Sequence, residues 1–354
     1  MRIRVEPRLT ASRRYKIAVT LASFLFAVPL IAIIFMVYGV NPIEAYSVVL
    51  NGAFGTYSRQ AETITKSIPL MLCAVGLSLA FETKFFNIGA EGQFHVGAMF
   101  STWVALNLSD LPGYLLLPLM AVAGFLGGWL WGLIPTLLKV LWKTNEVITT
   151  LLMNYISLKI LAYLVYGPWR GADTWGFPYT SKFNTNAWLP VVEGTRLHYP
   201  TLILAIIAAL VIYLVVKRTR FGFETRIVGK NPDAAHYLGV NNLKVYVLVM
   251  LVSGGLAGLA GFGEVAGIQH RLRENISPGY GFTGIIVAWL GRLHPISTAF
   301  MAVVFGGLLV GGEMIQIKLN LPFATIQLFN GVFLLSILMG EYLLKNRIVL
   351  EVDS

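Results

Sequence analysis

Charged residues and cysteine are scarce in this sequence. Charged side chains make up 12% of the 354 residues and hydrophobic side chains 56%, whereas a soluble domain carries about a quarter charged residues. The single cysteine, Cys73, lies in an apolar run, which excludes a disulfide or a cysteine metal site within the chain. The five histidines are scattered, which argues against a histidine metal cluster.

Long apolar segments are abundant instead, and they recur from Ile17 to Leu344. Most of them approach the roughly 20 residues that a helix needs to cross a bilayer. We therefore expect an all-α, polytopic membrane protein with about ten transmembrane helices. The segments lie near residues 17–38, 63–81, 88–107, 113–140, 146–166, 199–216, 245–268, 281–293, 297–316 and 322–343. The eighth segment is too short for a straight span, so we expect it to be broken or re-entrant.

The distribution of Lys and Arg predicts the orientation. The basic segment 1–16 precedes an apolar run too long for a signal peptide, and most of the 27 Lys and Arg residues fall in segments predicted to lie inside. Both termini are therefore expected in the cytoplasm. The predicted division is a cytoplasmic segment 1–16, a transmembrane domain 17–344 with a cytoplasmic loop 217–244, and a cytoplasmic tail 345–354. Because the net charge of +10 is distributed by membrane side, membrane lipids and not nucleic acid are the expected contacts.

A nucleotide-binding motif is also missing. Gly229-Lys230 is followed by Asn231, and Glu224 stands where a Walker A motif has its leading glycine. We therefore expect a non-enzymatic chain without catalytic residues, a metal or a cofactor of its own. Energy for uphill transport would have to come from ions or from another subunit.

A polar, glycine-rich segment interrupts the apolar pattern at Asn87–Gln93. Irregular backbone is tolerated at membrane depth only where it is buried in protein or lines a wet cavity, and the acidic Glu91 is costly there. The segment therefore indicates a substrate pathway. A short interfacial turn with Glu91 in water is the alternative.

Polar residues at helical spacing extend this hypothesis. Thr150, Asn154 and Ser157 share one face of the fifth span, and Gln327 and Asn330 share one face of the tenth. Amides can donate to and accept from sugar hydroxyls and ring nitrogens without a charge. Hydrogen bonding between helices is the alternative for both stripes. The candidate pathway residues are Asn87, Glu91, Gln93, Thr150, Asn154, Ser157, Gln327 and Asn330.

The loop 217–244 contains signals for a short helix. Asn231 can cap it, Pro232 and Asp233 suit its first turn, Ala234 and Ala235 favour helix, and Gly239 can end it. About two turns are marginal alone, so a partner is expected to pack on Tyr237 and Leu238. An amphipathic helix resting on lipid headgroups is the alternative.

Small residues follow in the next apolar segment. Gly254, Gly258 and Gly261, together with neighbouring alanines, have the spacing that lets helix backbones approach closely in lipid. We interpret them as a helix-packing face.

Four motifs in order resemble one family. They are FNIGAEGQFHVG at residues 86–97, TRFGFETRIVGKNPDAAHYLGV at 219–240, SGGLAGLAGFGEVAG at 253–267 and LGRLHP at 290–295. Together they resemble the permeases of bacterial ABC importers, in the branch of ribose, nucleoside and branched-chain amino acid permeases. The first motif, the residues around Glu224 and the segment Asn145-Glu146-Val147 most resemble nucleoside permeases. Ser297 stands where the family pattern has glycine.

The resemblance implies a type II-like permease subunit in the bacterial cytoplasmic (inner) membrane. Its implied partners are a cytoplasmic ABC ATPase that binds ATP and Mg, a second permease, identical or related, and an external solute-binding lipoprotein. The implied ATPase-coupling residues are Gly222, Arg226, Asn231, Pro232, Asp233, Ala234, Ala235, Tyr237, Leu238 and Gly239.

Two alternatives remain open at this point. The cargo could be a simple sugar such as ribose or another small solute. In a different class of protein, an ion-coupled secondary transporter, Glu91 or Lys159 would carry the coupling proton.

Overall fold

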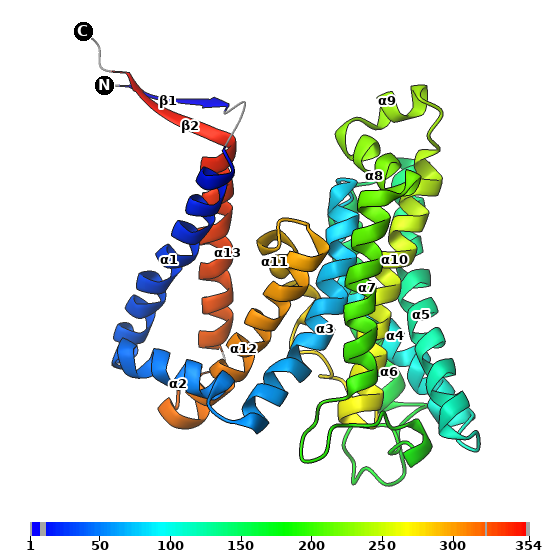
Figure 1. Cartoon of the computed structure of the whole chain (residues 1–354). Coiled ribbons are helices and arrows are strands. Elements are labelled where there is room, and N and C mark those ends of the chain that lie inside the picture. Colours follow the sequence, from blue (N-terminus) through cyan, green and yellow to red (C-terminus); the bar gives the residue numbers. More distant parts are fainter. Residues whose placement is uncertain (1, 8–11, 323, 352–354) are drawn as a thin grey trace. The chain divides into compact units, whose positions relative to one another are not determined.

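The computed structural model describes residues 2–7, 12–322 and 324–351, and these form two compact units (Figure 1). The terminal unit comprises Met1–Gly55 and Leu308–Ser354, and the central unit comprises Thr56–Gly307. Helix α12 (Pro295–Leu319) runs from the central unit into the terminal unit.

The terminal unit joins the two ends of the chain. Its elements are β1 (Arg2–Pro7), α1 (Arg13–Val37), α2 (Pro42–Phe54), the end of α12, α13 (Ala324–Lys345) and β2 (Asn346–Glu351). The strands pair antiparallel, with Arg2 opposite Glu351. Phe35 is fully buried, and its ring packs edge-on against Tyr46 and Phe329, with centroids 5.5 and 5.0 Å away.

Helix α2 was not predicted, although local signals mark its start. Gly39 adopts a left-handed φ of 72°, the Asn41 side chain accepts the Ile43 N–H at 2.9 Å, and Pro42 occupies the first helical position. The chain therefore turns by 111° between α1 and α2.

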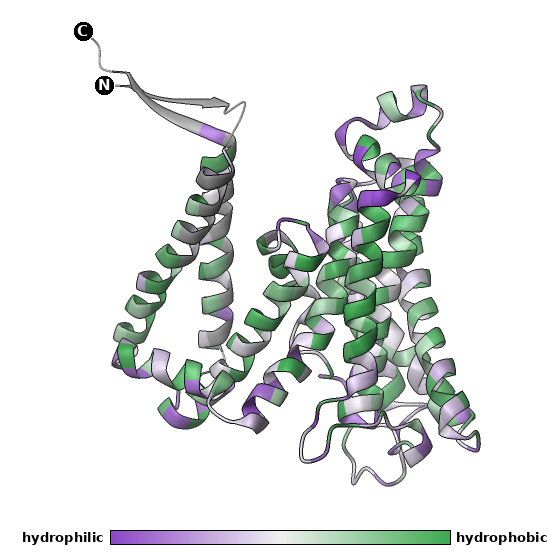
Figure 2. Ribbon diagram, in the orientation of Figure 1, coloured by the Kyte–Doolittle hydropathy of each residue, from purple (hydrophilic) through white to green (hydrophobic). Residues whose placement is uncertain are grey.

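The central unit is a helical bundle that contains the predicted site. Its elements are α3 (Tyr57–Glu82), α4 (Ala90–Asn107), α5 (Gly113–Trp142), α6 (Glu146–Tyr166), a 3₁₀ turn at Thr185–Ala187, α7 (Tyr199–Arg218), α8 (Arg220–Lys230), α9 (Pro232–Tyr237), α10 (Asn242–Glu264) with a π-helical turn at Val265–Gln269, α11 (Tyr280–Leu290) and the start of α12. Helices α3 and α10 are mostly buried, whereas α5, α6 and α7 expose apolar side chains. Figure 2 shows hydrophobic residues along these helices and hydrophilic residues gathered near α8 and α9.

The described residues contain six helices long and apolar enough to cross a membrane, or up to seven if the bent pair α1 and α2 forms one span. The chain is therefore an all-helical multi-pass membrane protein apart from its terminal strand pair. Each predicted apolar segment coincides with a helix, and α11, with 11 residues, is as short as expected. A count of ten spans and the cytoplasmic position of both termini stay predictions.

Close helix packing in the central unit depends on glycine. Gly258 lies against the Gly124 carbonyl of α5 and Gly261 against the Phe94 carbonyl of α4, so neither position has room for a Cβ atom. A Cβ at Gly254 would lie 2.6 Å from the Gly128 carbonyl oxygen. These three residues bring α10 into backbone contact with two neighbouring helices.

Candidate functional site

The predicted polar break is buried in protein and is shorter than expected, because Asn87–Gly89 lies between α3 and α4 whereas Ala90–Gln93 forms the first turn of α4. Helix α3 ends at Glu82, Lys84 turns the chain with a φ of 55°, and the Asn87 side chain accepts the Gly89 N–H at 3.0 Å. Asn87 and Gln93 are both buried. The irregular backbone is therefore surrounded by protein groups, as a break at membrane depth requires.

Asn87 and Gln93 form a reciprocal amide pair. Asn87 Nδ2 donates to Gln93 Oε1 at 2.9 Å, and Gln93 Nε2 donates to Asn87 Oδ1 at 3.3 Å. Asn87 Nδ2 also donates to Ser253 Oγ of α10 at 3.1 Å. The pair thus ties the break to α10 while satisfying its own polar atoms.

The polar stripe of α6 faces the same break. Thr150 Oγ1 accepts the Ile88 N–H at 3.2 Å, and Asn154 Nδ2 donates to the Ile88 carbonyl at 2.9 Å. Asn154 Oδ1 also accepts the Gly92 N–H at 2.8 Å. Ser157 is buried beside Gly92, where a Cβ would lie 3.0 Å from the Ser157 hydroxyl oxygen. These side chains satisfy backbone groups at the start of α4 that the helix itself leaves unpaired.

Glu91 connects the N-terminal ends of α4 and α11. It lies in the first turn of α4, is buried, and its Oε2 accepts the Gly281 N–H at the start of α11 at 2.7 Å. A carboxylate is stabilised at helix N-termini because their free N–H groups and dipoles are positive there. Glu91 therefore has a protein partner that explains how an acidic group is tolerated at this depth.

The remaining pathway candidates lie on α13, in the terminal unit. Gln327 is exposed, and the Asn330 side chain lies outside the described residues. The structure thus places six of the eight candidates in one cluster of the central unit. For all eight, contact with substrate stays a prediction.

The second candidate region comprises α8 and α9. Asn231 Oδ1 accepts the N–H groups of Asp233 and Ala234 at 2.9 and 3.1 Å, and Pro232 begins α9. Gly239 follows the helix with a φ of 79°. Ala235 is fully buried, whereas Tyr237 is 91% and Leu238 69% exposed. Helix α9 therefore holds two apolar side chains out from a packed base.

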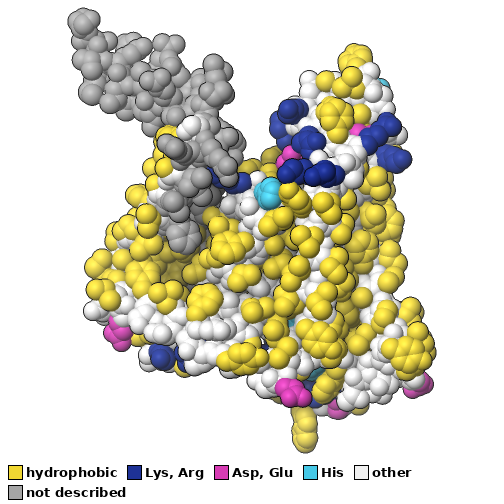
Figure 3. Space-filling model, in the orientation of Figure 1, with side chains coloured by type: hydrophobic (Ala, Val, Ile, Leu, Met, Phe, Trp, Pro, Cys, Tyr) yellow, Lys and Arg dark blue, Asp and Glu magenta, His cyan; other side chains and the backbone are white. Residues whose placement is uncertain are grey.

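Basic residues surround this projection. Figure 3 shows Lys and Arg side chains gathered at the end of the central unit where α8 and α9 lie. Among them, Arg220 Nε pairs with Glu224 Oε1 at 2.8 Å, while Arg226 donates to the Val216 carbonyl and Gly222 packs against that same backbone. Apolar anchors with a charged rim are typical of a protein-binding surface.

The structure also shows a contact that the sequence does not reveal. Gly229 of α8 lies against the Glu82 carbonyl at the end of α3, leaving no room for a Cβ. The same end of α3 leads into the buried break. Helix α8 thus connects the exposed α9 with the end of α3, from which the chain continues into the Asn87–Gln93 segment.

Lys139 was also missed by sequence reasoning. Its Nζ pairs with Glu146 Oε1 at 2.7 Å and lies 4.8 Å from the ring centroid of Phe85 and 5.3 Å from that of Tyr246. Lys139 thus links the end of α5 to the start of α6 and to Phe85, which precedes the break. No sequence signal pairs a lysine with a glutamate across that turn.

At the other end of α7, the loop of residues 167–198 packs on the π-helical end of α10. Leu189 N–H donates to the Ala266 carbonyl at 2.9 Å, and Phe183 N–H donates to the His270 carbonyl at 2.8 Å.

Two histidines lie in this region. Burial lowers the pKa of His198 to about 4. Burial, followed by the charge of Lys182, also lowers the pKa of His270, whose ring stacks on Trp188 with centroids 4.1 Å apart. Both imidazoles are therefore neutral near pH 7.

Comparison with known proteins points to a transport family. The family model described as "Branched-chain amino acid transport system / permease component" matches residues 60–339. A glucose ABC transporter permease protein of Haloferax volcanii is 32% identical, covering 99% of this chain and 94% of the relative. A nucleoside ABC transporter permease protein of Lactococcus lactis is 34% identical over 84% of each chain. A guanosine ABC transporter permease protein of Bacillus subtilis is 34% identical over 86% of this chain and 88% of the relative.

Proposed function

The chain belongs to the family of branched-chain amino acid transport system permease components, and from that premise we propose that it forms the nucleoside pathway of an ATP-driven importer. The chain is a transport subunit, and ATP with Mg binds to a separate ATPase. A nucleoside cargo is supported by the relatives named for nucleoside and guanosine transport. The chain itself carries no cofactor.

The observation that carries the proposal is the exposed end of α9. Tyr237 and Leu238 project from a helix that rests on the buried Ala235, and apolar anchors with a basic rim are typical of a protein-binding surface. We assign that partner as the cytoplasmic ATPase. Movement of α9 would reach the buried break through Gly229 and the end of α3, which gives the ATPase a mechanical route to the pathway.

Further subunits and a fixed orientation complete the proposed transporter. A second permease, identical or related, and an external solute-binding lipoprotein join the chain in the bacterial inner membrane. Both termini then lie in the cytoplasm with α8 and α9. The loop of residues 167–198, at the opposite end of α7, faces the lipoprotein.

A sugar is the second candidate cargo. The glucose permease relative aligns over 99% of this chain, so sequence similarity supports hexose as well as nucleoside. Uptake of labelled guanosine and labelled glucose into proteoliposomes that hold the assembled transporter separates the two. Uptake of guanosine alone supports the nucleoside assignment, and uptake of glucose alone overturns it.

ATP coupling is tested on α9. We expect Tyr237→Ala combined with Leu238→Ala to abolish co-purification of the ATPase and ATP-driven uptake. Tyr114→Ala is the matched control, because Tyr114 is an exposed aromatic residue at the start of α5. A bulky substitution of Ala235 is less informative, because this residue is buried in the base of α9.

Two results would overturn the proposal. One is a double variant that retains both ATPase binding and uptake. The other is wild-type uptake that ignores ATP but collapses with an ion gradient, which would make the chain an ion-coupled secondary transporter.

A further inference from the structure

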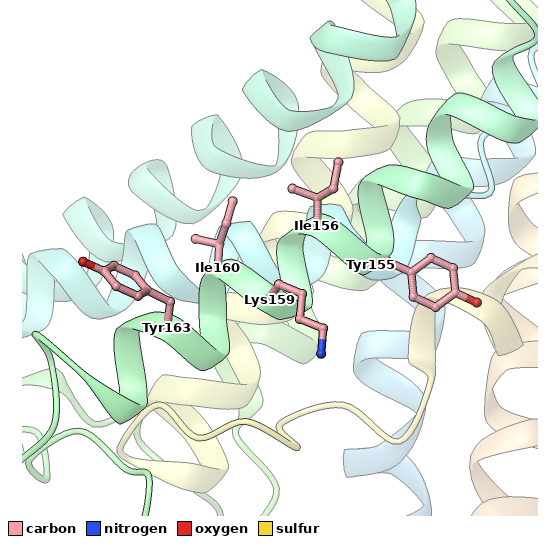
Figure 4. A pocket seen from close by; sticks show the side chains of 5 residues that line it. All are labelled: Tyr155, Ile156, Lys159, Ile160 and Tyr163. Carbon is pink, nitrogen blue, oxygen red and sulfur yellow. The ribbon is translucent and has the colours of Figure 1, made fainter.

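Helix α6 exposes a stripe of residues that differs from the exposed surface of α7. Tyr155, Lys159 and Tyr163 recur every four residues, and with Ile156 and Ile160 they line a shallow cavity of about 400 Å³ (Figure 4). All five side chains are exposed. By contrast, every exposed residue of α7 between positions 201 and 216 is aliphatic, as a lipid-facing surface requires.

Lys159 lies deep within its helix. It is seven residues from the nearer end of α6 at Tyr166, or about 10 Å at the rise of an α-helix. Helical side chains tilt towards the N-terminus, so the Lys159 side chain leaves α6 in the direction away from Tyr166. Figure 4 shows it extending from the ribbon with Tyr155 and Tyr163 on either side along the helix. Reaching the nearer membrane surface by snorkelling is therefore unfavourable.

The charge of Lys159 also has no carboxylate partner in the part of the chain that the structure describes. An ammonium group at this depth is strongly unfavourable in contact with hydrocarbon. A lipid chain is therefore an unfavourable neighbour for this face of α6. Water, a solute or a polar group of another subunit is the favourable neighbour for the Lys159 ammonium group.

We propose that Tyr155, Lys159 and Tyr163 line the water-filled substrate route and contact an uncharged, hydroxylated solute of the nucleoside class. This inference rests on the proposed function of the chain as an importer permease. The ammonium group donates up to three hydrogen bonds to ribose hydroxyls or to carbonyl and ring acceptors of a base. The two tyrosine rings offer flat apolar faces for a base and hydroxyl groups for a sugar.

The two faces of α6 then have separate roles. Thr150 and Asn154 use their hydrogen bonds on the backbone around Ile88 and Gly92. The opposite face keeps its polar groups open towards the solute. Substrate contacts that sequence reasoning places on the first face are thus assigned to the second.

Cysteine accessibility tests the assignment. Cys73 is the chain's single cysteine and is buried, so Lys159→Cys introduces one exposed thiol. The assembled transporter in proteoliposomes is treated with a charged, water-soluble methanethiosulfonate. We expect the thiol of Lys159→Cys to react at least about tenfold faster than that of Leu210→Cys on α7, because a thiolate forms readily only in water. The transported solute, guanosine or glucose, should slow the reaction.

Each outcome decides the proposal. Equal, slow reaction of Lys159→Cys and Leu210→Cys would show that this face of α6 is dry and would overturn it. Fast reaction that the transported solute does not slow would remove the solute contact and overturn it as well. As an independent readout, Lys159→Met should lower uptake about fivefold, and Lys159→Arg should lower it less, because arginine keeps the donors. Equal uptake by wild type and Lys159→Met would contradict the assignment.

A control in the same vesicles separates this inference from the proposed function. Wild-type uptake is measured with and without ATP. ATP-driven uptake together with an unreactive Lys159→Cys would reject only the α6 assignment. Uptake that does not need ATP would reject the importer itself.

Discussion

In the buried break, the side chains of Asn87 and Gln93 hydrogen-bond to each other, whereas at the end of α9 the side chains of Tyr237 and Leu238 project into solvent. Both regions depart from the pattern expected of their surroundings, since one puts polar groups inside and the other puts apolar groups outside. Polar groups that are paired inside fix a local geometry. Apolar groups left uncovered favour a partner. The comparison therefore distinguishes an internal joint from a docking surface.

The largest expected loss of stability comes from Asn154→Leu. The substitution leaves the Ile88 carbonyl and the Gly92 N–H buried without their partner, which costs about 3 kcal/mol of unfolding free energy. Thermal unfolding of the detergent-purified chain measures the loss. Leu152→Ala, at an exposed site on the same helix, is the control. Matching melting temperatures for the two variants would show that this amide does not hold the break.

Glu91→Leu should have the next largest effect. It removes the acceptor of the Gly281 N–H, and we expect about 2 kcal/mol of destabilisation. Glu91→Gln keeps an acceptor oxygen and should lose less than about 1 kcal/mol, since the replacement is close in shape. The same thermal assay compares them.

Uptake measurements on Glu91→Gln address the role of this carboxyl group. A residue that joins α4 to α11 should tolerate the amide, so ATP-driven uptake should persist. A stable Glu91→Gln protein without uptake would instead support proton transfer through Glu91.

A buried histidine should respond to pH in a way that the amide pair of the break does not. His198 is buried, and its Nε2 has no hydrogen-bond partner among the described residues. Its pKa is about 4 in the folded chain, whereas an unfolded histidine titrates near 6.5. The unfolded state therefore binds more protons between these values, so the stability present above pH 6.5 is lost as pH falls towards 4.

The expected loss is about 1 kcal/mol on lowering the pH from 7.5 to 5.5. Melting curves at the two pH values, recorded for wild type and His198→Asn, measure it. The variant should lose less stability over this interval. An identical pH dependence in both proteins would assign the effect to other groups.

The smallest effect on stability is expected for Tyr237→Ala. An exposed side chain makes few contacts, so the unfolding free energy should change by less than about 0.5 kcal/mol. The variant should nevertheless bind the ATPase more weakly, as measured by co-purification. A large fall in melting temperature would mean that Tyr237 packs within the chain and would remove the contrast with the buried break.

Local sequence signals predicted much of this structure. Asn231, Pro232 and Gly239 mark the ends of α9 because a cap acts on N–H groups two or three residues away. The same Asn-Pro signal occurs at Asn41-Pro42, but α2 has only 13 residues, so a search for segments of membrane-spanning length did not predict it. The pairing of β1 with β2 could not be predicted either, because its two strands come from opposite ends of the chain.

The partners in the candidate site were not predictable because they are distant in sequence. Asn87 bonds to Ser253 and Glu91 bonds to Gly281, and nothing in either local segment specifies the other. The apolar segments around these polar groups indicated that they need hydrogen-bond partners. Only packing brings α6, α10 and α11 to the break.

Helix α6 shows which features follow from the sequence and which follow from the tertiary structure. The sequence by itself determined that the segment is an apolar helix with two polar stripes, since a period of 3.6 residues places Thr150 with Asn154 and Tyr155 with Lys159. Tertiary structure decided which stripe is covered, because α4 packs on the first and leaves the second open. The physical reason is that helical periodicity depends on neighbours along the chain, whereas burial of a face depends on which other helix packs against it.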